Sequence, residues 1–179
     1  MVKVLGLHST RLYNISIPIE YSFYAYLFYE YLQGPMLKKA AMLLMIFLPT
    51  FCAVNLIFGQ GFKGFNSTNL LVSSSVILLL CCAYFVDLFR RDEEISLLRE
   101  PMFWITTGVL FFNMGELSTN LFWQYLLQNT REEYSKLIAL INSSLIYVLY
   151  TFISIGILCI KNPFRKMSGR SSGQQLPYL

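Results

Sequence analysis

Five polar side chains recur at helical spacing along one mostly apolar stretch of the sequence, between residues 102 and 127. At 100° per residue of an α-helix, their positions fall within about 80° of one another and predict a polar stripe on one helix face. The stripe comprises Thr106, Asn113, Glu116, Asn120 and Gln124. Glu116 lies near the middle of the stretch, where an ionised carboxylate is expensive, so we expect it to be protonated or well hydrogen-bonded. The sequence therefore predicts a polar site centred on Glu116.

A second polar face follows between residues 137 and 160, and it consists of Ser143, Tyr147, Tyr150 and Ser154. Hydroxyls and amides are the expected partners of Glu116, because no Lys or Arg lies at comparable depth in another apolar stretch. Further candidates are residues 73–75, all serines, together with Asn55 and Tyr24. Two interpretations stay open. The groups line a polar cavity or proton-linked pathway, or they hold the helices together by hydrogen bonds.

The elements that position these residues are apolar runs of membrane-spanning length. Hydrophobic residues make up 55% of the 179-residue chain and charged residues only 13%, whereas an average soluble domain has about 25% charged residues. A hydrocarbon core of about 30 Å needs about 20 helical residues. We therefore expect an all-α polytopic transmembrane helix bundle with five spans and short loops, at residues 16–32, 40–58, 70–89, 102–127 and 137–160.

Two terminal segments flank the expected bundle. Residues 1–15 form an N-terminal segment, and residues 161–179 form a polar, basic tail whose composition predicts disorder. The first span is short and rich in tyrosine, so an interfacial helix is an alternative for residues 16–32. Of the 14 Lys and Arg residues, five fall on the side of the N-terminus and nine on the other side. The positive-inside rule then predicts an outer N-terminus and a cytoplasmic C-terminus.

The residue types exclude several chemistries. The four cysteines lie inside apolar stretches without a C-x-x-C pair, and His8 is the single histidine, so we expect neither a metal site nor a cofactor. Phosphate-loop, nucleophile-elbow and metalloprotease motifs are absent, and we expect no enzymatic activity. The basic residues flank apolar stretches instead of forming a stripe, which argues against nucleic acid as a partner. Asp87, one turn before Arg90 and Arg91, predicts a helix cap or an i,i+4 ion pair.

Two segments carry a resemblance. Residues 20–24 (EYSFY), continuing to 27–29 (LFY), and residues 100–108 (EPMFWITTG) resemble segments of uncharacterised multi-span bacterial inner-membrane proteins. The resemblance implies a bacterial inner (plasma) membrane and no particular activity. We expect membrane lipids as partners, together with another membrane protein or a second copy of the chain. Two functions fit these features: a membrane-embedded sensing or accessory subunit, or a small oligomeric transporter or channel-like protein with a polar path centred on Glu116.

Overall fold

The computed structural model describes residues 2–59, 66–91, 97–126 and 132–161, and over these ranges the chain is helical with no strand. The side chains are described for residues 12–59, 66–91, 97–122 and 137–160. The helices of this part of the chain are α1 (Val2–Tyr31), α2 (Pro35–Val54), α3 (Ser67–Phe89), α4 (Pro101–Leu126) and α5 (Glu132–Lys161). A π-helical turn (Asn55–Gly59) extends α2, and a 3₁₀ turn (Leu97–Arg99) precedes α4. The expected all-α class is thus confirmed.

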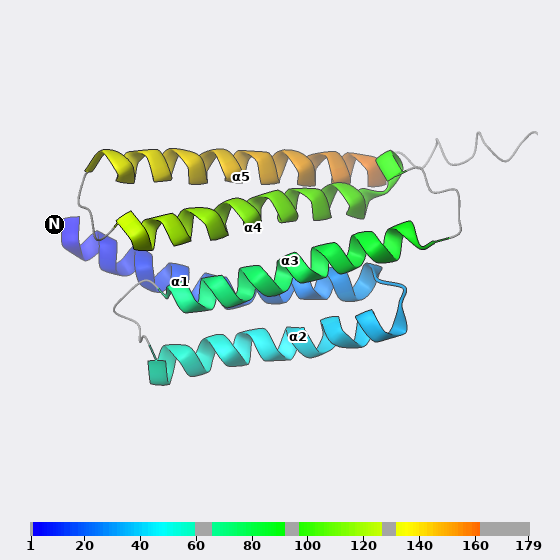
Figure 1. Cartoon of the computed structure of the whole chain (residues 1–179), viewed down its shortest axis with the longest axis horizontal. Helices are drawn as coiled ribbons and strands as arrows, with labels where there is room; N and C mark the ends of the chain where they lie inside the picture. The colour runs from blue at the N-terminus through cyan, green and yellow to red at the C-terminus, as the bar shows by residue number, and fades with distance from the viewer. Residues whose placement is uncertain (1, 60–65, 92–96, 127–131, 162–179) are drawn as a thin grey trace, which may run out of the picture.

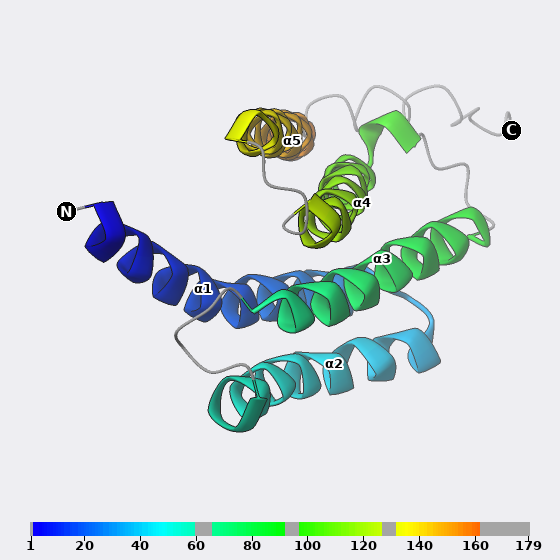
Figure 2. The ribbon, with the colours of Figure 1, turned by 60° about the vertical axis from the view of Figure 1, so that its left-hand side comes forward.

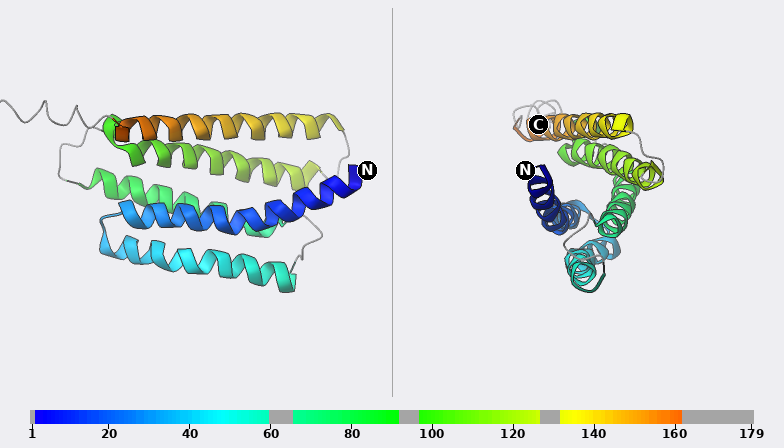
Figure 3. Two further views of the ribbon diagram at one scale, coloured as in Figure 1. Left: turned by 180° about the vertical axis from the view of Figure 1, so that it is seen from behind. Right: turned by 90° about the vertical axis from the view of Figure 1, so that its left-hand side faces the viewer.

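Consecutive helices run antiparallel beside one another (Figure 1). α4 packs between α3 and α5, and its contact with α5 is the most extensive in the bundle. α1 packs mainly against α2 and also against α3. The end-on view in Figure 3 shows α5, α4 and α3 following one another, with α2 on the far side of the bundle from α5 and α1 beside α2 and α3. α4 is therefore the element that joins α5 to the other helices.

Three helical segments are long and apolar enough to cross a membrane: Pro35–Gly59, Ser67–Phe89 and Leu137–Ile160. They correspond to the second, third and fifth expected spans. α1 and α4 carry the tyrosines and the polar stripe, and these side chains lower the hydropathy of both helices. The fold is thus an all-helical bundle with three candidate membrane spans.

α1 begins at Val2, well before the start expected at Ser16, so the N-terminal segment 1–15 is largely part of this helix. Pro18 lies inside α1, where its ring removes one backbone hydrogen bond and bends the helix. The Ser22 hydroxyl donates to the Pro18 carbonyl at 2.6 Å, and Figure 2 shows α1 curving along its length. The expected tail after residue 161 lies outside the described residues.

Candidate functional site

A hydrogen-bonded cluster joins three helices at Glu116. The Tyr13 hydroxyl donates to Glu116 Oε1 at 2.7 Å, and the Tyr21 hydroxyl donates to Oε2 at 3.1 Å. The Tyr21 oxygen also lies 2.6 Å from Ser74 Oγ, and either atom can be the donor. Both carboxyl oxygens therefore have a phenol partner from α1, and one of these phenols extends the chain to α3.

Helical periodicity brings the two tyrosines to this place. On α1, Ile17, Tyr21, Tyr24 and Phe28 are buried at spacings of three or four residues, which defines the inward face of the helix. Tyr13 lies one turn before Ile17 on the same side, so both phenols reach α4. Sequence reasoning selected Glu116 and suggested Ser74, but it missed Tyr13 and Tyr21. The Tyr24 hydroxyl, also suggested, donates instead to Glu20 Oε1 at 3.0 Å.

Three members of the expected stripe on α4 are buried. Thr106 and Asn113 are fully buried, and Asn120 is 6% exposed. Asn113 Nδ2 donates to the Val109 carbonyl at 2.8 Å. Asn113 Oδ1, both amide atoms of Asn120 and the Thr106 hydroxyl find no hydrogen-bond partner among the described residues. The side chain of Gln124, the last expected member, lies outside the described part of the chain.

Small residues where α4 meets α5, Gly108 on α4 and Gly156 on α5, fix the direction of the stripe. A Cβ atom on Gly108 would lie 2.7 Å from Phe152 Cβ, and one on Gly156 would lie 2.9 Å from the Pro101 carbonyl oxygen. Such close approach of two helices is typical of small residues in membrane proteins. This contact with α5 turns the polar stripe of α4 toward α3 and α1.

The polar face expected on α5 does not join the cluster. Ser143, Tyr147, Tyr150 and Ser154 are all exposed. The two serine hydroxyls donate to carbonyls of their own helix, those of Ala139 and Tyr150. α5 instead contacts α4 through a face that includes Asn142, Leu149 and Gly156, about 130° around the helix from these four residues. None of the four residues hydrogen-bonds to Glu116 among the described residues, so a shared site stays a prediction.

A second polar cluster, built from asparagines, joins α1, α2 and α3 at the N-terminal end of α3. Asn55 Nδ2 donates to Asn66 Oδ1 at 3.0 Å and to Asn69 Oδ1 at 2.7 Å. Asn69 Nδ2 donates to the Cys52 carbonyl, and Asn14 Oδ1 accepts from the Asn66 amide. Asn66 also caps α3 by accepting from the Asn69 amide. These bonds account for the cluster as a helix-joining network.

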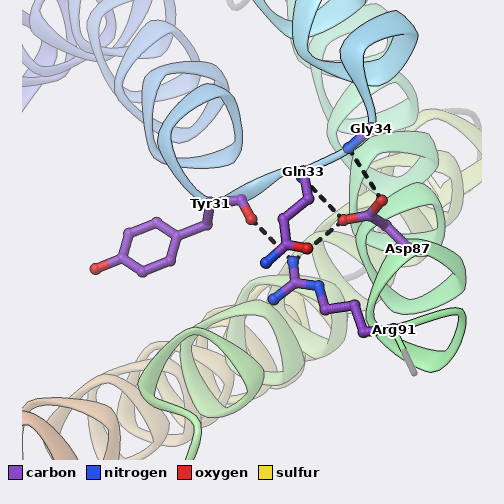
Figure 4. Close-up of polar contacts among 5 residues, drawn as sticks. All are labelled: Tyr31, Gln33, Gly34, Asp87 and Arg91. Carbon is purple, nitrogen blue, oxygen red and sulfur yellow. Dashed lines mark hydrogen bonds and ion pairs between the residues drawn. The ribbon is translucent and has the colours of Figure 1, made fainter. Parts of the chain in front are cut away.

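At the opposite end, Asp87 connects α3 to the turn between α1 and α2 (Figure 4). Its carboxylate pairs with Arg91 at 3.1 Å, which confirms the expected i,i+4 ion pair. It also accepts the backbone amides of Gln33 at 3.0 Å and Gly34 at 3.2 Å. Arg91 Nη2 in turn donates to the Tyr31 carbonyl at 3.0 Å. We call these contacts the Asp87 clip.

Metal chemistry finds no support among the described side chains. No group of three or more His, Cys, Asp or Glu residues is placed to hold an ion there, and the cysteines are free thiols. Asp87 with Arg91 is the one ion pair of this part of the chain. Glu116 is therefore held by hydroxyls and not by a described cation.

No protein-family model matches the chain, and no curated protein or solved structure shows significant similarity to it.

Proposed function

We propose that the chain is an integral membrane protein of a bacterial inner membrane that crosses the bilayer five times, with α1 and α4 as spans beside the three apolar helices. α4 has 26 residues and α1 has 30, so at 1.5 Å per residue they extend about 39 and 45 Å, more than the core thickness. The buried residues of the α4 stripe face protein, which makes a span of lower hydropathy tolerable. The distribution of Lys and Arg supports an outer N-terminus.

Within the membrane, the chain acts as a sensing or accessory subunit without catalytic activity. The observation that carries this proposal is a pair of phenols at the centre of α5. Tyr147 is 75% exposed and Tyr150 is 62% exposed, midway along the apolar segment Leu137–Ile160. Tyrosine normally lies at the membrane interface, where its hydroxyl reaches water. A helix of another membrane protein packed on this face would supply polar partners that lipid chains lack.

Native mass spectrometry of the protein, gently extracted from its own membrane, tests the proposal. We expect a stoichiometric second polypeptide, which is lost in the double variant Tyr147→Phe and Tyr150→Phe. The matched control is Tyr31→Phe, which removes a hydroxyl that is also exposed, but at the end of α1. A wild-type protein that carries only lipid contradicts the accessory function.

The second candidate function is a small oligomeric transporter with Glu116 on its path. It is favoured by a carboxyl group in the bundle interior next to buried amides without partners. Five spans are few for one transporter chain, so pairing of subunits would complete the fold. A homo-oligomer in the same mass spectra, with flux abolished by Glu116→Gln, would support this function.

A further inference from the structure

The interior face of α4 carries polar atoms that the described protein does not satisfy. Asn113 Oδ1 and both amide atoms of Asn120 are buried without a partner. Unpaired buried amides are costly, and in native proteins ordered water is their usual partner. Glu116 lies between them, three residues after Asn113 and four before Asn120. At 1.5 Å per residue, the successive steps are about 4.5 and 6 Å along the axis, distances that single water molecules can bridge.

The row of polar groups formed by Asn113, Glu116 and Asn120 does not continue toward the N-terminal end of α4. We call this row the polar line. Between Thr106 and Asn113 lie about 10 Å of helix. The buried side chain there is Val109, 1% exposed, and Ile77 of α3 belongs to the same apolar core. Neither side chain offers a polar group to water. The line therefore extends from Asn113 toward the C-terminal end of α4, which is the proposed outer end.

We propose that water molecules occupy this line, as an inlet that runs from Asn120 to Glu116, stops at Val109 and receives water from the outer side. Its ligands are water and the proton that Glu116 exchanges with it. When the carboxyl group releases its proton to an inlet water, a carboxylate and a hydronium ion result, and the reverse transfer restores both reactants. The inlet would exist whether or not another membrane protein packs on the exposed face of α5.

The hydrogen-bonded chain from Glu116 through Tyr21 to Ser74 accommodates both the ionised and the protonated side chain of Glu116. With a carboxylate, Ser74 donates to Tyr21 and Tyr21 donates to Glu116. With a carboxyl group, Glu116 donates to Tyr21 and Tyr21 donates to Ser74. The 2.6 Å Tyr21–Ser74 contact allows either direction, because each hydroxyl can both donate and accept. Proton exchange with the inlet then requires only that hydroxyl hydrogens rotate, with no change of helix packing.

Substituted-cysteine labelling tests the inlet. The four native cysteines are first replaced by alanine, and single cysteines are introduced at Asn120, Met114 and Thr106 of the full chain in proteoliposomes. A cationic, membrane-impermeant methanethiosulfonate is added from the outer side, and it reacts only with hydrated, ionised thiols. Met114 is the matched control because it is 53% exposed on the same helix, next to Asn113.

We expect Asn120→Cys to react at least about tenfold faster than Met114→Cys, since only the first thiol would meet water. Thr106→Cys should stay unreactive because Val109 closes the inlet. Equally slow labelling of Asn120→Cys and Met114→Cys would overturn the proposal. Labelling of Thr106→Cys from the outer side would also overturn it, and would point to a continuous path.

Hydroxyl-radical footprinting of the wild-type protein supplies a measurement that no substitution can disturb. Radicals form from water, so a buried aromatic ring is oxidised only if water lies beside it. Tyr21 is 2% exposed and Phe28 is 1% exposed, and both lie on the inner face of α1. We expect oxidation of Tyr21 well above that of Phe28. Equal protection of the two rings would refute the inlet, whatever the mass spectra say about a partner.

Discussion

Removing the Asp87 carboxylate should open the turn between α1 and α2. The carboxylate accepts two backbone amides and one guanidinium group, at 3.0 to 3.2 Å. The side chains of Asp87 and Arg91 are only 12% and 11% exposed. Each hydrogen bond to a charged group contributes about 1.5–3 kcal/mol, and bonds that share one acceptor are not additive. We therefore expect Asp87→Ala to cost about 3 kcal/mol locally.

Hydrogen–deuterium exchange measures this loss at the two amides themselves. Every 1.4 kcal/mol corresponds to a factor of ten in an equilibrium constant, so exchange at Gln33 and Gly34 should become about a hundredfold faster in Asp87→Ala. Arg91→Gln removes the ion pair and the bond to the Tyr31 carbonyl but keeps both amide bonds. We expect about a tenfold increase for that variant.

Arg90→Gln is the control for charge and position. Arg90 is exposed and adjacent to Arg91, yet the clip does not include it, so its loss should change exchange at the turn by less than about threefold. If Asp87→Ala and Arg90→Gln gave the same exchange at Gln33 and Gly34, the Asp87 clip would not hold the turn, and the reasoning would be refuted.

Four further substitutions probe the rest of the bundle, each measured as a shift in thermal unfolding in detergent. Gly108→Ala should destabilise by about 1–3 kcal/mol because its new methyl group meets Phe152 Cβ, whereas Gly115→Ala meets only the flexible end of a leucine and should cost less. Asn66→Ala should cost about 1–2 kcal/mol through loss of the α3 cap and its amide contact. Glu116→Gln should cost about 1–3 kcal/mol, since an amide accepts only one of the two phenol hydrogens.

Features that depend on local chemistry were predicted well from the sequence. α3 ends at Phe89, where the expected span also ends, because the apolar run gives way to Arg90 and Arg91. The ion pair of Asp87 with Arg91 follows from i,i+4 spacing alone. α1 extends back to Val2, well beyond the span expected at residues 16–32, and Pro18 lies inside this helix.

The candidate site was predicted in part, for a physical reason. The stripe on α4 follows from periodicity, and its buried members face protein. On α5 the same kind of stripe is exposed and makes no hydrogen bond to Glu116 among the described residues, because a serine hydroxyl can donate to the carbonyl four residues earlier and then needs no partner helix. Which face of a membrane helix turns inward depends here on close approach at Gly108 and Gly156, which polar periodicity does not encode. Tyr13 and Tyr21 were missed because an aromatic pattern does not reveal which helix the hydroxyls reach.

The form of the Glu116 cluster bears on why a carboxyl group occupies that position. An asparagine or glutamine would join helices at lower cost in a membrane, and α4 already uses asparagines at other positions of the stripe. Tyr13 and Tyr21 place one phenol donor on each oxygen of Glu116. A carboxylate accepts both hydrogens at once, whereas an amide would require one phenol to turn its hydrogen away and accept instead. The surroundings of Glu116 are therefore matched to a group with two acceptor oxygens. Unlike the amide of asparagine or glutamine, a carboxyl group gains and loses a proton. The cluster therefore suits a group whose charge changes better than it suits simple helix packing.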